Sequence, residues 1–356
     1  MSKKNQSFLK SPLRIAVCGL GLVGRRHVEA IEQIRGIKFV AGVDPSYDGR
    51  KFSADRGVPA FSTMNEMLKK VTPDGIILAT PTKLHAQQAM ECINLAIPVL
   101  IEKPIADNLD DARDIVLNAE NAGVPVIVGH HRRHNPVIQK AKTIIDDGKI
   151  GEIRAIHSTC WFYKPDEYFE CSPWRKMRGA GPVSVNSVHD VDLIRFLCGK
   201  IISVQAQVTN SQRGYENEDV AAALLRFENN AIGTITVSDS IVAPWSWEMT
   251  SKEYPIYPKT SQSSYMIGGS HGSLSIPDLT MWTHEVHRDW WKPISATSAP
   301  FESSDPLINQ IIHFKAVIEG RESPLVTARE GLKTLEVVAA IQKAAQTLEI
   351  VHLSQL

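Results

Sequence analysis

The sequence lacks most of the features that mark specialised classes of protein. Its five cysteines are odd in number and include no C-x-x-C pair, which argues against a disulfide framework and against a sulfur-rich zinc site. Lysine plus arginine total 39, as do aspartate plus glutamate, so no excess charge favours nucleic acid. No apolar run approaches the roughly 18 residues of a membrane-spanning helix. We therefore expect a cytoplasmic protein with reduced thiols and with no membrane or nucleic-acid partner.

What is present is an ordinary globular composition, with 43% hydrophobic and 22% charged residues in a chain of 356. This length is typical of about two domains. Residues 1–11 have too short an apolar segment for a signal peptide, so we expect a disordered leader there. We place the first domain at 12–130 and the second at 131–356, and leave open whether the final helices pack back on the first.

The first domain alternates short apolar runs with amphipathic stretches, which is typical of βαβ units on a parallel sheet. This alternation predicts a doubly wound α/β domain of the Rossmann type. The expected strands are Leu13–Cys18, Ile37–Val43, Gly75–Ala79, Val99–Ile101 and Val124–Val128. The expected helices are Val23–Ile34, Leu84–Leu95 and Leu109–Ala122.

The second domain carries longer β-branched and aromatic runs, which predict an α+β domain with a large, mostly antiparallel open sheet. The expected strands are Ile150–Phe162, Ile201–Thr209, Asp219–Phe227 and Ile232–Val242, with a turn at Asn229-Asn230. The expected helices are Val137–Asp147, Val183–Leu197, Leu307–Glu319 and Ala328–Thr347. Between strand and helix signals, the Pro- and Ser-rich segment Ala243–Ser263 is expected to be a loop.

A G-x-G-x-x-G sequence lies directly between the first expected strand and the first expected helix. In that place Gly19 permits a tight turn, Gly21 lets the backbone approach a pyrophosphate, and Gly24 lets the helix pack closely on the strand. The N–H groups at the start of the helix, which includes Leu22 and Val23, favour an anion. This arrangement predicts that the first domain binds a dinucleotide.

Asp44 ends the second expected strand, 20 residues after Gly24. A carboxylate at this spacing accepts a hydrogen bond from the ribose 2′-hydroxyl and repels a 2′-phosphate, so Asp44 favours NAD over NADP. Arg50 and Lys51 follow closely enough in the sequence that NADP stays open.

Further motifs follow in a fixed order. They are Ala79-Thr80-Pro81 with His85, Glu102-Lys103-Pro104, Gly129 with Arg132-Arg133 and Asn135-Pro136, and His189 with Asp192. Together with the glycine turn they resemble the Gfo/Idh/MocA oxidoreductases, a family that includes glucose-fructose oxidoreductase and inositol dehydrogenase. The resemblance extends from about Arg14 through Asp305-Pro306-Leu307 to the closing helices.

The resemblance implies an NAD(P)-dependent oxidoreductase that acts on a CH–OH group and assembles as a dimer or tetramer through the second-domain sheet. Lys103 matches a lysine that contacts the reacting oxygen and the nicotinamide, and His189 matches the catalytic histidine. Cofactor contacts are also implied for Thr80, Pro81, His85 and Glu102. These roles agree with the chemistry, because oxidation of a carbinol needs a base for the hydroxyl proton and a positive charge for the developing alkoxide.

One position departs from the family pattern. Many members carry aspartate four residues before the catalytic histidine, and Val185 stands there in this chain. Asn186 lies three residues before His189, on the same face of a helix, and is a candidate catalytic and substrate-binding residue. Asp190 and Asp192 remain alternatives for orienting His189.

The remaining candidate substrate-binding residues combine aromatic faces with cations, and this combination suits a substrate with a polar ring. They are Arg132, Trp161, Tyr163 and Arg175. His130, His131 and His134 are close in sequence, but Pro136 disturbs the helix that they would need, and we predict no metal site.

These features predict an NAD-dependent dehydrogenase that oxidises a secondary hydroxyl of a sugar, sugar acid or cyclitol, with His189 as the base and Lys103 as the partner of the oxyanion. A carboxylated cyclic diol suits the arginines as well. Two other hypotheses stay open: an enzyme of epimerase type that keeps its nucleotide bound, and a non-catalytic sugar-sensing regulator, against which Lys103 and His189 argue.

Overall fold

The computed structural model describes residues 11–356, so the expected leader lies outside the described residues apart from Ser11. The chain forms two compact units. Unit 1 comprises residues 11–129 and Leu307–Leu332, and unit 2 comprises His130–Pro306 and Lys333–Leu356. The chain therefore leaves unit 1 after Gly129 and returns to it for the helix that begins at Pro306.

Unit 1 contains a six-stranded sheet in which all neighbouring strands are parallel. The strand order is β3-β2-β1-β4-β5-β6, as the doubly wound prediction requires. The strands are β1 (Leu13–Cys18), β2 (Ile37–Val43), β3 (Ala60–Phe61), β4 (Gly75–Leu78), β5 (Val99–Ile101) and β6 (Val126–Val128). The order reverses between β1 and β4, and ligands of such sheets bind beside this point, at the carboxyl ends of the strands.

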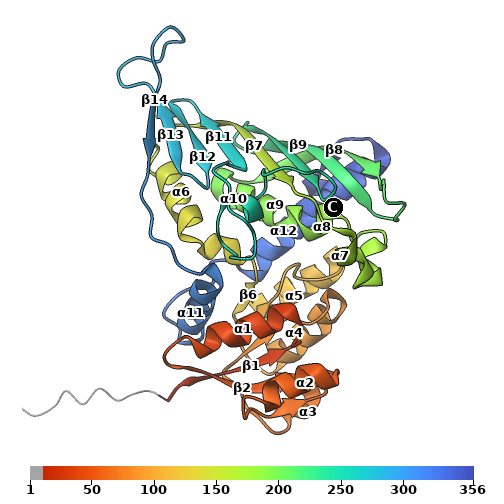
Figure 1. The fold of residues 1–356 in the computed structure, drawn as a ribbon. Helices are drawn as coiled ribbons and strands as arrows, with labels where there is room; N and C mark the ends of the chain where they lie inside the picture. Colours follow the sequence, from red (N-terminus) through yellow and green to blue (C-terminus); the bar gives the residue numbers. More distant parts are fainter. Residues whose placement is uncertain (1–10) are drawn as a thin grey trace, which may run out of the picture. The chain divides into compact units, whose positions relative to one another are not determined.

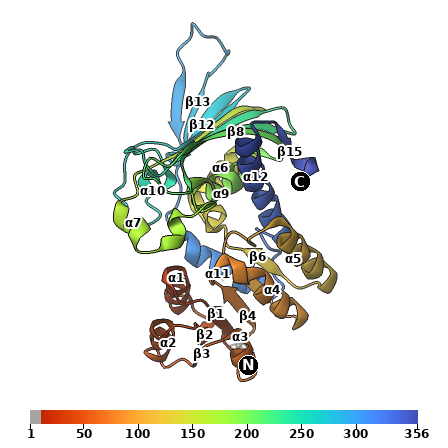
Figure 2. The same cartoon turned by 90° about the vertical axis from the view of Figure 1, so that its right-hand side faces the viewer.

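Helices cover both faces of this sheet. Ile15, Val17 and Ile77 form one core with apolar residues of α1 and α11. Cys18 points to the opposite face, close to Cys92 of α4, and α5 lies beside α4 there (Figure 2). The helices of unit 1 are α1 (Leu22–Glu32), α2 (Tyr47–Ala54), α3 (Met64–Leu68), α4 (His85–Asn94), α5 (Leu109–Ala122) and α11 (Pro306–Ile318).

Unit 2 contains a nine-stranded sheet in the order β14-β13-β12-β11-β7-β10-β9-β8-β15. The pair β7 and β10 is parallel and the other pairs are antiparallel, so the prediction of a mostly antiparallel sheet is confirmed. The longer strands are β7 (Ile153–Trp161), β8 (Ile201–Asn210), β9 (Glu218–Phe227) and β10 (Ile232–Ser238). The others are β11 (Tyr265–Gly269), β12 (Gly272–Ile276), β13 (Thr280–Thr283), β14 (Ser295–Ser298) and β15 (Val351–His352).

Helices cover one face of this sheet, as Figures 1 and 2 show for α6 (Pro136–Asp146), α9 (Ser187–Cys198) and α12 (Ala328–Thr347). Their apolar residues share a core with inward-facing strand residues such as Leu225 and Phe227. Leu224, between them, points to the other face and is 43% exposed. We call that other face the outer face. The short helices of unit 2 are α7 (Asp166–Glu170), α8 (Pro182–Val185) and α10 (Trp247–Thr250).

Several elements differ from the sequence prediction. Residues 47–68 form α2, β3 and α3, whose short polar segments carry no clear apolar period. The predicted helix Val183–Leu197 is divided at Asn186 into α8 and α9, because Asn186 leaves the regular helical conformation. The strands β11 to β14 were not predicted, since their Ser, Thr and Gly residues weaken the strand signal.

Candidate functional site

The glycine turn lies at the carboxyl end of β1, and its glycines are required by geometry. Gly19 has φ of +85°, and a Cβ there would lie 2.4 Å from the carbonyl oxygen of Ala79. A Cβ on Gly24 would lie 1.8 Å from the carbonyl oxygen of Gly19. By contrast, nothing lies within 4 Å of a Cβ built on Gly21. Gly21 caps α1 without a side-chain hydrogen bond, so the turn offers backbone N–H groups beside open space, which fits a pyrophosphate.

Asp44 connects the end of β2 to this turn. Its Oδ2 accepts from the backbone N–H of Leu20 at 2.7 Å, and its Oδ1 accepts from the N–H and the hydroxyl of Ser46 at 2.8 and 2.6 Å. Partial burial raises the pKa of Asp44, but these hydrogen bonds outweigh burial, and the pKa lies below its ordinary value. Asp44 is therefore ionised at neutral pH. Besides its predicted contact with the ribose, it holds the glycine turn in place, a role that the sequence motif did not reveal.

The cations near Asp44 have partners within unit 1. Arg50 donates to the carbonyl oxygens of Asp44 and Pro45 at 3.0 and 2.6 Å. Lys51 pairs with Asp55 at 2.6 Å. Both side chains are thus bound to groups of α2 or of the residues before it, which makes them less available to bind the 2′-phosphate of NADP.

His85, at the start of α4, is 1% exposed and joins two loops at the carboxyl edge of the sheet. Its Nδ1 lies 2.9 Å from the carbonyl oxygen of Pro104 and its Nε2 lies 2.9 Å from that of Thr80. Burial lowers the pKa of His85, so the neutral ring donates from one of these nitrogens. His85 therefore fixes the loops after β4 and β5, while the hydroxyl of Thr80 donates to Gln88.

Glu102 and Lys103 follow β5, and the bond between Lys103 and Pro104 is cis. Glu102 is 9% exposed, and its Oε1 lies 2.8 Å from Nε2 of His27, a fully buried residue of α1. Its Oε2 accepts from the backbone N–H of Lys103 at 3.1 Å. The carboxylate thus fixes the backbone of Lys103, whose side chain is half-buried. His27 escaped the sequence analysis because it directly follows two arginines in an amphipathic helix.

His189 lies in the first turn of α9 in unit 2 and is 8% exposed. The rings of His131 and His130 meet it edge-on, with centroids 5.6 and 6.4 Å away. Nε2 of His131 in turn lies 3.0 Å from Oε1 of Glu253. Burial raises the pKa of Glu253, but His131 and other donors outweigh burial and lower it to about 2. His189 therefore stands within a group of polar side chains whose positions are set by tertiary contacts.

The two arginines that follow the histidines are buried in ion pairs. Arg132 is 5% exposed and donates to Glu248 at 2.6 Å, with Asp190 at 3.6 Å. Arg133 makes two hydrogen bonds of 2.8 Å to the carboxylate of Asp192. These contacts give both arginines a structural role in unit 2, and substrate contact by Arg132 stays a prediction.

The alternatives for orienting His189 have different surroundings. Asp190 is fully buried and accepts from the hydroxyl of Tyr265, and burial raises the pKa of Asp190 to about 7. Asp192 accepts from Arg133 and from the hydroxyl of Thr334 at 3.0 Å. Asn186 is half-buried at the start of α9, where its backbone carbonyl oxygen accepts from the backbone N–H of His189 at 3.1 Å.

The aromatic candidates and Arg175 lie in different parts of unit 2. Trp161 lies on the outer face, in a pocket of about 610 Å³ with Trp245 and Trp282. Tyr163 is 50% exposed, and Arg175 packs on the ring of Tyr168 with its guanidinium carbon 4.0 Å from the centroid.

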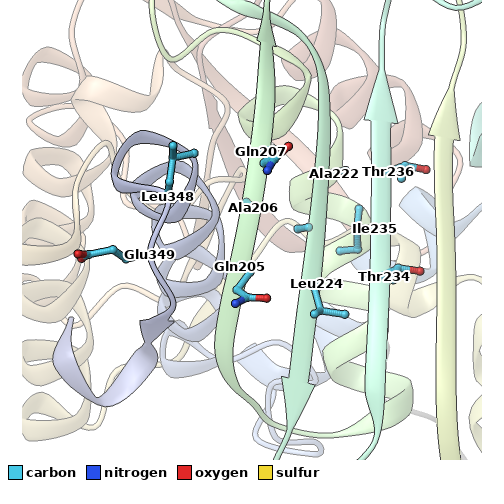
Figure 3. Close-up of a pocket in the computed structure, with 11 residues that line it drawn as sticks. Gln205, Ala206, Gln207, Ala222, Leu224, Thr234, Ile235, Thr236, Leu348 and Glu349 are labelled. Carbon is cyan, nitrogen blue, oxygen red and sulfur yellow. The ribbon is translucent and has the colours of Figure 1, made fainter.

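A second hollow of about 450 Å³ lies on the outer face over β8, β9 and β10. Figure 3 shows Gln205, Gln207 and Leu224 projecting into it, with Leu348 and Glu349 nearby. Neither hollow contains a predicted catalytic residue.

Within residues 11–356, no group of three or more His, Cys, Asp or Glu side chains is arranged to hold a metal ion. No helix in this part of the chain combines the length and the hydrophobicity needed to cross a membrane.

Two family models match the sequence. Residues 13–130 match the oxidoreductase family with an NAD-binding Rossmann fold, and residues 138–275 match the GFO/IDH/MocA C-terminal domain. The chain belongs to the Gfo/Idh/MocA oxidoreductase family. The glycine turn, Asp44 and the reversal of strand order therefore lie in the part of the chain that this family uses to bind NAD.

Individual relatives give the range of similarity. Inositol 2-dehydrogenase of Mycolicibacterium smegmatis is 33% identical over 200 residues, which cover 52% of this chain and 53% of that protein. The 1-carboxy-3-chloro-3,4-dihydroxycyclohexa-1,5-diene dehydrogenase of Comamonas testosteroni is 30% identical over 64% of this chain and 58% of that protein. The chain thus spans less than two thirds of the length of these two relatives. The solved WlbA dehydrogenase of Bordetella pertussis, in complex with NADH and UDP-GlcNAcA, has a TM-score of 0.77 and 25% identity, covering 96% of this chain and 98% of that one.

Proposed function

We propose that this member of the family is an NAD-dependent dehydrogenase that oxidises a secondary hydroxyl of a sugar, sugar acid or cyclitol. The observation that carries the proposal is the glycine turn held by Asp44 beside the reversal of strand order. An open Gly21 and an uncapped start of α1 suit the pyrophosphate, and the ionised Asp44 suits a ribose 2′-hydroxyl. The names of the relatives, which include an inositol dehydrogenase, favour a polar ring as substrate.

The chemical roles follow from the side chains of this chain. Bound NAD would accept the hydride from the carbinol carbon. His189 would take the hydroxyl proton, since an imidazole suits this duty near neutral pH. Lys103, whose backbone is fixed by Glu102, would stabilise the negative charge that develops on the oxygen. The products are a ketone, NADH and a proton.

NAD rather than NADP is the proposed cofactor, because a 2′-phosphate would meet the carboxylate of Asp44. Arg50 and Lys51, which could have compensated, are hydrogen-bonded to backbone carbonyls and to Asp55. Thr80, Pro81, His85 and Glu102 are proposed to shape the cofactor site, with His85 acting through the two loops that it joins.

A carboxylated cyclic diol is the second candidate substrate, because the relative from Comamonas testosteroni is named for a carboxylated dihydroxy ring.

We also propose a homodimer or homotetramer that forms through the outer face of the nine-stranded sheet. Large apolar side chains on this face are exposed to solvent: Ile232 by 50%, Met266 by 47% and Trp282 by 41%. An exposed apolar surface of this kind is typical of a protein–protein interface. The five cysteines are free, as the proposed cytoplasmic location requires.

The experiment that tests the proposal is a screen of sugars, cyclitols and sugar acids with NAD and NADP in parallel, read by the absorbance of the reduced cofactor. We expect net NADH formation with at least one compound and less with NADP. Product that forms without net NADH, on protein that retains its nucleotide, would favour the epimerase-type alternative. Protein that binds NAD and polyols but turns none over would favour the regulator.

A further inference from the structure

Lys164 is a buried lysine for which the proposed mechanism has no use. It follows β7 and is 6% exposed, with its backbone N–H donating to the carbonyl oxygen of Asp239 at 2.9 Å. Its Nζ donates to Oδ1 of Asn186 at 2.7 Å and to Oδ2 of Asp239 at 3.3 Å. The ring centroid of Tyr168 lies 4.9 Å from the same nitrogen. The ammonium is therefore held in one place by several fixed groups.

This contact decides which way the amide of Asn186 points. An ammonium has donors and no acceptor, so only the oxygen of the amide can face it. The Nδ2 group of Asn186 consequently turns away from Lys164, and no side chain or backbone group among residues 11–356 accepts a hydrogen bond from it. Asn186 is half-buried at the start of α9, and its backbone carbonyl accepts from the N–H of His189 at 3.1 Å, so its two side-chain N–H donors belong to the residue that begins the helix of the proposed base.

Neighbouring carboxylates offset the charge of Lys164, so the lysine does not simply attract anions. Asp239 also accepts from Arg213 at 3.1 Å, and Arg213 lies 3.3 Å from Asp219. Arg213 also lies 3.9 Å from the exposed Asp166, so the two cations of this cluster face three carboxylates. Burial raises the pKa of the neighbouring Glu218, which disfavours a further negative charge there. The effect of this cluster on Asn186 is to fix the orientation of its amide, and therefore the direction in which its side chain can donate hydrogen bonds.

We propose that Lys164 is a positioning residue that makes Asn186 a hydrogen-bond donor, and that this selects substrates with a carboxylate near the reacting hydroxyl. Sugar acids and carboxylated cyclic diols would then be preferred to neutral polyols, because a carboxylate only accepts hydrogen bonds and accepts them strongly. This inference rests on the proposed dehydrogenase function and names the substrate class within it.

The test compares kcat/KM for acids and neutral counterparts with NAD: D-glucuronate with D-glucose, D-galacturonate with D-galactose, and quinate with myo-inositol. For the pair that is used best, we expect the acid to exceed the neutral compound by about tenfold or more, the effect of one hydrogen bond to a charged group. Asn186→Asp places a carboxylate where the donors were, and should reverse this preference. Lys164→Met frees the amide to rotate, and should reduce the preference mainly through a higher KM for the acid.

Matched controls are Asn65→Asp and Lys200→Met, which change exposed residues of α3 and of the segment before β8. Both should keep the wild-type ratio of acid to neutral activity. A reversal in Asn186→Asp cannot result from misfolding, since misfolding lowers both activities. The inference is overturned if wild-type enzyme uses neutral polyols as well as acids, or if neither variant changes the ratio. A panel in which no member reduces NAD contradicts the proposed function itself.

Discussion

Asp44 is the residue at which the structure makes its sharpest prediction about the cofactor. Replacing Asp44 by Asn keeps the size of the side chain but leaves one acceptor oxygen in place of two. In the native chain these oxygens accept from Leu20 and Ser46 over 2.6 to 2.8 Å. An NH₂ group must therefore face either the buried N–H of Leu20 or the donors of Ser46, and the glycine turn loses a support in either case.

The magnitude follows from the two interactions that Asp44→Asn weakens. A buried donor without a partner costs about 1–3 kcal/mol, and a hydrogen bond from ribose to a charged acceptor contributes about 1.5–3 kcal/mol. Because about 1.4 kcal/mol is tenfold in affinity, the Kd for NAD should rise by about tenfold to several hundredfold. The Kd for NADP should rise less, because the substitution also removes repulsion of the 2′-phosphate.

Isothermal titration of each protein with NAD and with NADP measures both changes. The control is Asp48→Asn, since Asp48 is exposed and its ion pair with Arg25, at 3.2 Å, lies at the surface. We expect the preference for NAD over NADP to fall by about tenfold in Asp44→Asn, from loss of the charge on the acceptor, and to stay unchanged in the control. Equal effects on the two cofactors, or an equal effect of the control, would refute the role of Asp44.

Three further predictions concern the mechanism and the stability of the units. Lys103→Ala should lower turnover by about 100-fold or more through loss of the oxyanion partner, while titration shows NAD binding nearly intact; lost NAD binding would contradict this role. Asp192→Asn should destabilise unit 2 by about 3–5 kcal/mol because it breaks a buried ion pair, whereas the exposed pair of Asp110 should contribute less than about 1 kcal/mol. Urea unfolding followed by tryptophan fluorescence reports on unit 2 alone, since all seven tryptophans lie in it. Because His131 and neighbouring donors lower the pKa of Glu253 to about 2, its ionised form stabilises unit 2 above the unfolded-state pKa of about 4.3, and this contribution is lost as the pH falls towards 2. Glu253→Gln should flatten the dependence of unfolding free energy on pH in that range, and an unchanged profile would contradict the assignment.

The parallel sheet of unit 1 could be predicted from sequence because its strands are buried on both faces. Strands β1, β2 and β5 have the predicted bounds, since each is a short, mainly apolar segment that a polar or glycine residue follows. The short strand β3 and helices α2 and α3 could not be predicted, because they depend on docking against the edge of the sheet. In unit 2, strands β11 to β14 are rich in small polar residues and take their strand conformation from pairing: β11 pairs with β7, and β12, β13 and β14 are added in turn.

The candidate site divides in the same way. Local spacing located the glycine turn, Asp44 and the strand ends that carry Thr80 and Lys103. It could not reveal pairings between distant residues, such as His27 with Glu102, 75 positions apart, or Lys164 with Asn186, 22 positions apart. Each of these pairs depends on the fold to bring a cation or an imidazole to a partner, so neither residue stands out in a one-dimensional pattern.

Transfer of hydride from the carbinol carbon to NAD is the central claim. The most direct measurement uses the best substrate of the screen, prepared with deuterium on that carbon, and determines the mass of the reduced cofactor. Wild-type protein should give NADH that carries the deuterium, and His189→Asn protein that still binds NAD should give almost none. Reduced cofactor without the label, or undiminished labelling in His189→Asn, would contradict it.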